Sequence, residues 1–193
     1  MVPLVHSETG EMTLYSTDDT YVDSEAAQYN LGGTETLAIL TENDPNSPVE
    51  IAWLKFDLLS IPDYAAVDSA TLQLWATDVP IEHKPSIDVH SCGNISWTEM
   101  NLTYSNSPVY NETVMDSVQA TTASAWYSWN VFSSVKESLD NQSAAVTFVL
   151  DTKTNTQEQE TYVSTQFSSE ESISYVPRLI VNWSDTCQNI QPV

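Results

Sequence analysis

Alternation of apolar and polar residues dominates the chain and predicts β-strands. The clearest case is residues 52–58, where Ala52, Leu54, Phe56 and Leu58 alternate with polar or aromatic neighbours. Successive side chains of a strand point to opposite faces, so a period of two indicates a strand with one buried face. The same pattern predicts further strands at residues 12–15, 20–22, 36–40, 70–74, 87–89, 127–131, 146–150, 162–167 and 179–183.

One short helix is expected between the strands, with Ser133 as its N-cap, Val135 and Leu139 facing the core, and Asp140 and Asn141 at its end. Elsewhere Pro, Asn, Asp and Ser separate the apolar segments. About ten short strands with turn signals between them predict an all-β fold. We expect an antiparallel β-sandwich, jelly-roll-like, with one short helix near 133–140.

The chain has 193 residues, enough for one sizeable core and short for two. It contains no internal repeat and no stretch with the composition of a linker. We therefore expect one β-sandwich domain over residues 17–183, with an N-terminal extension or edge strand at 1–16 and a tail at 184–193.

The charge balance is strongly acidic, with 27 acidic residues, 5 basic residues and a net charge of -22. Binding of nucleic acid needs clustered Lys and Arg, so a nucleic-acid partner is excluded. No apolar run approaches the ~18 residues of a membrane span, so membrane insertion is not expected. Divalent cations would offset the repulsion among so many carboxylates.

Four groups of residues, in this order and spacing, resemble the DNRLRE domain, also described as the disaggregatase-related repeat and as a carbohydrate-binding module. The resemblance covers roughly residues 17–183. The segments that carry it are DTYVD at 19–23 with NLGG at 30–33, LKFDLLSIP at 54–62 with SATLQL at 69–74, WTEMNLTYSNSP at 97–108, and YVPRLIV at 175–181.

The resemblance implies a β-sandwich module of secreted and cell-surface proteins of archaea and bacteria. Such modules are often attached to polysaccharide-degrading enzymes or repeated in adhesins, and some bind acidic or neutral glycans. The basic residues of the family are scarce in this chain, which disfavours an anionic glycan.

Three tryptophans are candidates for carbohydrate binding. Trp53, Trp75 and Trp126 alternate with the core-facing positions of their strands, so they are expected on the outer faces. The C–H groups of a sugar ring stack on an exposed aromatic face, and two of these rings side by side would form a platform. The alternative is that another layer, a loop or a partner subunit covers them. Trp97, at the start of a turn-rich segment, is expected to be a packing anchor.

Acidic residues gather near the first strands and before the last one. If the first and last strands are neighbours, these oxygen ligands would lie together and suit Ca²⁺, which takes six to eight of them. The alternative is a solvated acidic surface. The predicted calcium ligands are Asp18, Asp19, Asp23, Glu25, Asn30 and Glu170, with Glu171 next to the last.

The two cysteines, Cys92 and Cys187, are expected to form one disulfide, and two free buried thiols are the alternative. Together with the scarcity of lysine and the glycosylation sequons, the cysteines favour an extracellular, cell-surface location. The five sequons place predicted N-glycosylation at Asn94, Asn101, Asn111, Asn141 and Asn182.

Catalysis finds little support in the sequence. The three histidines, His6, His83 and His90, have no metal-ligand spacing, and there is no G-x-S-x-G motif. We therefore expect no enzyme but an extracellular module that binds a glycan or a neighbouring surface protein. The alternative is a self-assembling subunit of an extracellular filament, sheath or surface layer, polymerised by strand exchange through residues 1–10, with Ca²⁺ bridging its acidic residues.

Overall fold

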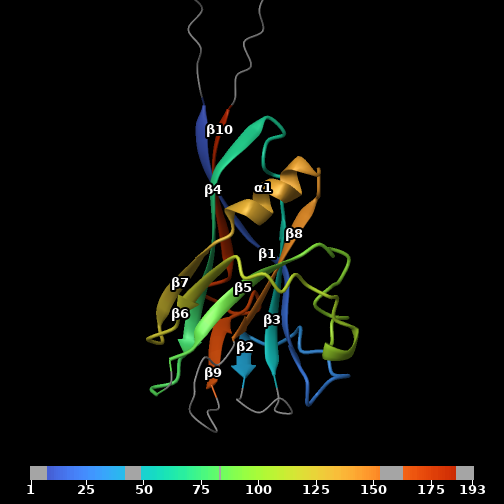
Figure 1. Cartoon of the computed structure of the whole chain (residues 1–193), viewed down its shortest axis with the longest axis vertical. Coiled ribbons are helices and arrows are strands. Elements are labelled where there is room, and N and C mark those ends of the chain that lie inside the picture. The colour runs from blue at the N-terminus through green and yellow to red at the C-terminus, as the bar shows by residue number, and fades with distance from the viewer. Residues whose placement is uncertain (1–7, 42–48, 83, 153–162, 186–193) are drawn as a thin grey trace, which may run out of the picture.

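The computed structural model describes residues 8–41, 49–82, 84–152 and 163–185. These residues form ten β-strands, one α-helix and one 3₁₀ helix (Figure 1). The strands are β1 (Thr9–Asp23), β2 (Thr36–Thr41), β3 (Glu50–Asp57), β4 (Ala65–Asp78), β5 (Ser86–Cys92), β6 (Asp116–Gln119), β7 (Ala125–Asn130), β8 (Ala145–Thr152), β9 (Val163–Ser168) and β10 (Arg178–Asp185). The helices are α1 (Phe132–Asp140) and the 3₁₀ turn Tyr104–Asn106.

The strands pair in antiparallel fashion and close on themselves. Hydrogen-bonded neighbours follow the order β1, β10, β4, β9, β2, β3, and β3 pairs again with β1, which closes six strands into a barrel. β8, β5 and β6 extend the sheet from β3, and β7 extends it from β4. The all-β antiparallel class is confirmed. The sandwich and jelly-roll arrangement stays a prediction, because these pairings join the strands into a ring.

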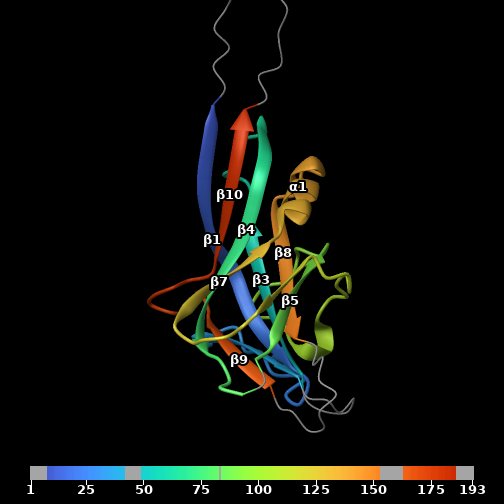
Figure 2. The ribbon, with the colours of Figure 1, turned by 60° about the vertical axis from the view of Figure 1, so that its left-hand side comes forward.

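β1 closes the barrel, because it pairs with both β10 and β3. The strands expected at 12–15 and 20–22 are one continuous strand, whose register shifts between Ser16 and Asp18. Before the shift β1 pairs with β10, and after it with β3. The first part of β1 therefore lies beside β10 and β4 at one end of the molecule (Figure 2). The boundary expected between residues 16 and 17 falls within this strand.

The helix starts earlier than expected. Its N-cap is Val131, and Ser133 lies inside the first turn, so the prediction of Ser133 as N-cap was wrong. Oδ1 of Asn130, the residue before the N-cap, accepts the backbone N–H of Phe132 at 3.1 Å and so satisfies one of the unpaired N–H groups of the first turn. Val135 is buried against the strands, as the pattern predicted.

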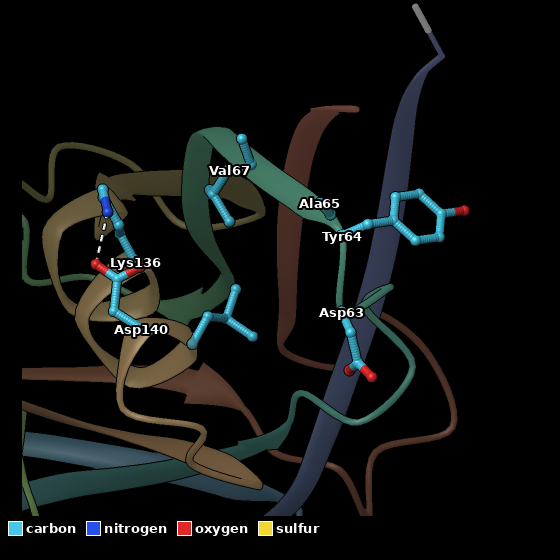
Figure 3. Close-up of a pocket in the computed structure, with 8 residues that line it drawn as sticks. Asp63, Tyr64, Ala65, Val67, Lys136 and Asp140 are labelled. Carbon is cyan, nitrogen blue, oxygen red and sulfur yellow. Dashed lines mark hydrogen bonds and ion pairs between the residues drawn. The ribbon is translucent and has the colours of Figure 1, made fainter. Parts of the chain in front are cut away.

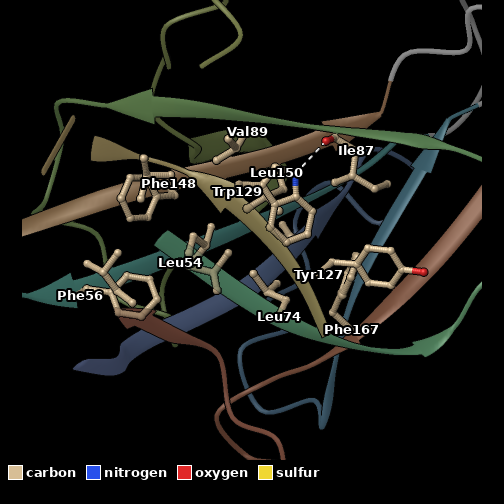
Figure 4. Close-up of a cluster of buried hydrophobic side chains, with 14 of the residues drawn as sticks. Leu54, Phe56, Leu74, Ile87, Val89, Tyr127, Trp129, Phe148, Leu150 and Phe167 are labelled. Atoms are coloured by element: carbon tan, nitrogen blue, oxygen red, sulfur yellow. Dashed lines mark hydrogen bonds between the residues drawn. The ribbon is translucent and has the colours of Figure 1, made fainter. Parts of the chain in front are cut away.

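The main core fills the space between the strands (Figure 4). Trp129 is fully buried there, and its indole N–H donates to the carbonyl of Ile87 at 2.9 Å, which satisfies its one polar group. Most core residues come from the alternating positions of the predicted strands. The largest fully buried ones include Leu54, Phe56, Leu72, Leu74, Phe148 and Phe167.

A second, smaller apolar cluster lies on the outer side of β3 and β8. Trp53 and Val149 contribute from these strands, and Trp97 and Leu102 contribute from the segment 93–115. This segment therefore covers the outer face of β3 and β8. Trp97 is buried with its ring edge-on to Trp53, 6.1 Å between ring centroids, which confirms the expected packing role.

Candidate functional site

The outer face of β10, β4 and β7 carries a group of aromatic and polar side chains in register. Trp75 of β4 lies opposite Trp126 of β7. Two residues away on β4, Gln73 lies between Arg178 of β10 and Ser128 of β7. Side chains two apart on a strand share a face, so these residues are brought to one surface by the alternation that buries Leu72 and Leu74.

Three rings and one guanidinium group form a compact cluster on this face. The rings of Trp75 and Trp126 meet edge to face, 5.6 Å apart. Tyr175, in the loop between β9 and β10, stacks on Trp75 with 4.1 Å between centroids and 10° between planes. The guanidinium carbon of Arg178 lies 4.1 Å from the centroid of Trp126. We call Trp75, Trp126, Tyr175 and Arg178 the aromatic cluster.

Polar contacts fix the orientation of Arg178. Its Nε donates to Oε1 of Gln73 at 2.9 Å, and Nε2 of Gln73 donates to Oγ of Ser128 at 3.0 Å. Together with the cation–π contact to Trp126, this chain of contacts holds the guanidinium plane against the sheet. The cluster therefore combines apolar ring surface with hydrogen-bonding groups in fixed positions.

Tyr175 is held in an uncommon backbone conformation. Its φ is 65°, in the left-handed region that a bulky residue enters at a cost of roughly 1–2 kcal/mol. Its side chain is also the most exposed of the three rings, at 51% for the residue. A strained backbone that presents an aromatic ring to solvent is a feature of ligand-binding sites. The ring contacts of Tyr175 with Trp75 and Trp126 stabilise this position.

Of the three candidate tryptophans, the structure brings Trp75 and Trp126 together and separates Trp53 from them. Trp53 points to the outer side of β3, as the alternation predicted, but it is only 1% exposed. Trp97 and Tyr110 lie edge-on to its ring and cover it. The expectation that Trp53 offers a sugar-binding face was wrong, because the segment 93–115 occupies that face.

A group of carboxylates lies where the loop after β9 meets β1. Glu99, Glu170 and Glu171 each place a carboxylate oxygen within 4.8 Å of the others. The backbone N–H of Glu170 donates to both oxygens of Asp19, at 3.0 and 3.3 Å, and Oγ of Ser16 donates to Asp19 at 2.8 Å. We call Asp19, Glu99, Glu170 and Glu171 the acidic cluster.

Burial and mutual repulsion alter the titration of these carboxyl groups. Asp19 is 1% exposed, and this burial raises its pKa to about 7, with smaller contributions from the charges of Glu171 and Glu99. Burial, a hydrogen bond with the carboxyl group of Glu99 and the charge of Asp19 also raise the pKa of Glu170. Each group therefore binds a proton more readily than usual.

Two carboxylate oxygens of the acidic cluster are buried without a hydrogen-bond donor among the described residues. They are Oε2 of Glu99 and Oε2 of Glu171. A buried carboxylate oxygen without a donor is costly, and a cation would remove that cost. Ca²⁺ prefers oxygen ligands of this kind.

The other predicted calcium ligands have different roles. Asp18 forms an ion pair with Lys55 at 2.8 Å, and Oδ1 of Asp23 accepts the backbone N–H of Glu25 at 2.8 Å. The amide of Asn30 donates to the carbonyls of Glu99 and Leu102. Asn30 thus positions the backbone of a cluster residue from a neighbouring loop. Of the predicted set, the acidic cluster contains Asp19 and Glu170.

Gly32, two residues after Asn30, allows the same approach of two loops. A Cβ atom at Gly32 would lie 2.3 Å from the carbonyl oxygen of Glu99, so only glycine fits. The NLGG segment therefore helps to fix Glu99, which lies far from it in the sequence, within the acidic cluster.

His90 belongs to a buried hydrogen-bond network on β5 and β8. Its Nδ1 lies 3.1 Å from the carbonyl of Asn111, and its Nε2 lies 3.2 Å from Oδ1 of Asp151. The hydroxyl of Tyr110 donates to Oδ2 of Asp151 at 2.9 Å. Asp88 also offers a carboxylate oxygen to this group. The network fastens the end of the segment 93–115 to the sheet and gives both ring nitrogens of His90 a partner.

A hollow of about 420 Å³ lies between α1 and the start of β4 (Figure 3). Asp63, Tyr64 and Val67 line it from the strand side, and Lys136 and Asp140 line it from the helix. Nζ of Lys136 lies 2.6 Å from Oδ2 of Asp140, so these two charges neutralise each other. Lys136 is the one Lys or Arg among the described residues that line this hollow, and it is paired.

The structure describes some of the residues of the remaining predicted sites. Four sequon asparagines, Asn94, Asn101, Asn111 and Asn141, are exposed, and Asn182 is half-buried on β10. Cys92 is buried, with its thiol 3.7 Å from the carbonyl of Val109. Cys187 and residues 1–7 lie outside the described residues. The disulfide, the use of the sequons and strand exchange through residues 1–10 therefore stay predictions.

Site residues that the sequence patterns did not indicate are Tyr175, Arg178 and Glu99, whereas Glu171 was named beside Glu170. Tyr175 and Arg178 belong to the YVPRLIV segment, and Glu99 to the WTEMNLTYSNSP segment, which carried only the family resemblance. Both segments fall at or outside the ends of strands, where a period of two gives no information about which face a side chain occupies.

The chain is thus an antiparallel all-β module that presents aromatic rings on one outer face. The sequence model of carbohydrate-binding module family 96 matches residues 10–183, so the chain belongs to that family. Comparison with curated proteins finds no match for the chain. Among the described residues, the structure contains no helix with the length and apolar character needed to cross a bilayer.

Proposed function

We propose that this protein is an extracellular, non-catalytic module that binds a glycan through the aromatic cluster. The stack of Tyr175 on Trp75 is the observation that supports this most directly, because it presents an exposed ring at a backbone position that folding alone does not favour. Family membership supports carbohydrate as the ligand class. The narrower resemblance to the DNRLRE domain is part of this proposal.

The exposed ring of Tyr175 gives the sharpest test of glycan binding. Tyr175→Ala is expected to weaken binding to a glycan about fivefold, because stacking on an aromatic ring contributes about 1 kcal/mol. Tyr175→Phe, which keeps the ring, is expected to bind within about twofold of the unmodified protein. Affinity gel electrophoresis over a panel of soluble polysaccharides, followed by calorimetry with the best ligand, measures both.

Tyr29→Ala is the matched control, because Tyr29 is an exposed tyrosine away from the cluster. Circular dichroism shows whether each variant is folded. Unchanged glycan affinity in a folded Tyr175→Ala protein would remove the aromatic cluster as the binding site.

We also propose that the acidic cluster binds Ca²⁺ and that the ion stabilises the fold. The support is the pair of buried, unsatisfied oxygens on Glu99 and Glu171 beside the buried carboxylate of Asp19. These residues would contribute carboxylate ligands, and the ion would offset their repulsion. Calcium-dependent adhesion is compatible with this site, and no described contact favours it over glycan binding.

Calcium is expected to raise the melting temperature by about 5 °C or more, since a ligand at a hundred times its Kd adds about 2.7 kcal/mol. Differential scanning calorimetry in CaCl₂, with NaCl of equal ionic strength as reference, measures the shift. Glu171→Gln should abolish most of it, whereas Glu137→Gln, an exposed change on α1, should not. An equal shift in the Glu171→Gln protein would contradict the site.

A further inference from the structure

Beyond the aromatic cluster, the outer face of β4, β7 and β10 carries hydroxyl and amide side chains together with Ile180. In the next row along the strands, Thr71 lies between Ile180 and Asn130. In the row after that, Ser69 lies opposite Asn182, whose amide donates to Oγ of Ser69 at 3.1 Å. Hydroxyl and amide groups in rows of this kind match the hydroxyl groups of a sugar chain.

A hollow of about 420 Å³ lies on this same face, within the usual range of about 300–1,000 Å³ for small-ligand sites. Its polar lining residues are Asp68, Ser69, Thr71, Asp116, Ser128 and Asn130, and we call it the polar hollow. Ser128 also accepts the hydrogen bond from Gln73, so the polar hollow adjoins the aromatic cluster. From Trp75 to Ser69 the strand spans about 20 Å, at ~3.4 Å per residue.

The charges around this surface disfavour an anionic ligand. The polar hollow contains two carboxylates, Asp68 and Asp116, and no Lys or Arg lines it. Carboxylates accept hydrogen bonds from sugar hydroxyls but repel the acid groups of a uronate polymer. The whole chain, with a net charge of -22, adds to that repulsion.

Among the described residues, the three lysines make their polar contacts elsewhere. Lys55 pairs with Asp18, Lys136 pairs with Asp140, and Nζ of Lys84 donates to the carbonyl of Pro80 at 2.6 Å. Arg178 is the one described basic side chain in the aromatic cluster, where it lies over Trp126. A polymer with an acid group on every sugar would meet a single guanidinium and at least two carboxylates.

We infer that the ligand is an uncharged polysaccharide that lies along β4 from the aromatic cluster into the polar hollow and contacts several consecutive sugars. This inference rests on the proposed function and adds the charge class of the glycan, its direction on the sheet and a second part of the site. Sugar rings stack at Tyr175, and hydroxyl groups further along the chain bond to the polar hollow.

The charge class is tested by affinity gel electrophoresis with soluble β-glucan, mannan and xylan as neutral polymers and polygalacturonate as the anionic one. We expect retardation by at least one neutral polymer, nearly independent of NaCl between 20 and 500 mM (roughly the range over which charge screening changes most). Polygalacturonate should cause no retardation.

The second part of the site is tested by Thr71→Arg, which fills the polar hollow without touching the rings. Calorimetry with oligosaccharides of the best neutral polymer should show at least tenfold weaker binding of a hexasaccharide and an unchanged affinity for a disaccharide. Val109→Arg makes the same change of charge at an exposed position on the segment 93–115, outside both parts of the site, and should bind both ligands normally.

Preferential binding of polygalacturonate, lost in Arg178→Gln, would overturn the inference and leave the proposed function intact. Equal hexasaccharide binding in a folded Thr71→Arg protein would overturn the part that concerns the polar hollow. Failure of every polymer, neutral and anionic, to bind the unmodified protein would instead contradict the proposed function itself.

Discussion

At the scale of a single residue, the burial of Asp19 makes the stability of the acidic cluster depend on pH. Its carboxyl group is buried on β1 and accepts hydrogen bonds from Ser16 and Glu170. These bonds lower its pKa, but burial and the neighbouring acids outweigh them and raise it to about 7. Near neutral pH a cation and a proton therefore compete for the same oxygens.

The metal-free protein is expected to lose stability as the pH rises. The pKa of Asp19 in the folded state, about 7, is above its ordinary value of 3.8, so its contribution is complete below about pH 4 and disappears as the pH passes through 7. The loss is on the order of a few kcal/mol. Urea unfolding between pH 4 and pH 8 in metal-free buffer measures it.

Asp19→Asn should reduce this pH dependence, because an amide does not ionise, and the raised pKa of Glu170 accounts for what remains in the acidic cluster. Calcium should have a similar effect on the unmodified protein, since the ion stabilises the ionised carboxylates. A metal-free protein as stable at pH 8 as at pH 4 would contradict the assigned burial of Asp19.

At the scale of elements, the loop between β9 and β10, residues 169–177, joins both proposed sites. Glu170 and Glu171 belong to the acidic cluster, and Tyr175 follows four residues later in the aromatic cluster. The first residue, Ser169, fixes the loop beside the start of β2, because its backbone N–H donates to the carbonyl of Glu35, the residue before that strand. An ion bound near the start of this loop restricts the positions open to its end.

Calcium is therefore expected to increase glycan affinity severalfold, because a loop that is already ordered loses less entropy when Tyr175 contacts the ligand. Calorimetry with the best glycan, in CaCl₂ and in metal-free buffer, measures the ratio. By linkage the glycan must increase calcium affinity by the same factor. The Glu171→Gln protein should bind the glycan equally in both buffers, and a calcium effect that persists there would argue against coupling through this loop.

The strands and the loops differ in how far the sequence predicts them. Alternation located the strands because it is a local property, and it placed Trp53, Trp75 and Trp126 on outer faces. It could not tell that the segment 93–115 covers Trp53, because that segment has no periodicity. Strand β6 was not predicted, since Val118 is its one apolar residue. The position of the Tyr175 ring was not predicted either, because the direction of this side chain depends on a positive backbone φ that the alternation does not indicate.

At the scale of the whole molecule, composition and structure answer different questions about charge. Composition excluded nucleic acid and disfavoured anionic glycans. It could not show that Lys55 and Lys136 are paired, or that Asp68 and Asp116 line a surface next to the rings. The acidic residues of the cluster come from three separate parts of the chain, residues 19, 99 and 170–171. Spacing along the sequence therefore could not reveal which carboxylates meet.

Thr9 and Ser184 lie opposite each other, and the N–H of Asp185 donates to the carbonyl of Glu8 at 2.7 Å, so β1 begins where β10 finishes. A force that pulls residues 8 and 185 apart would break the backbone hydrogen bonds between β1 and β10 one pair at a time, starting from this end. Two paired strands that are opened from one end separate at low force, because few hydrogen bonds carry the load at a time. When the strands are pulled along their length, all the hydrogen bonds between them carry the load together. Arg178 lies at the opposite end of β10, beside Tyr15. The part of this strand pair that contributes to the proposed glycan site would therefore separate last.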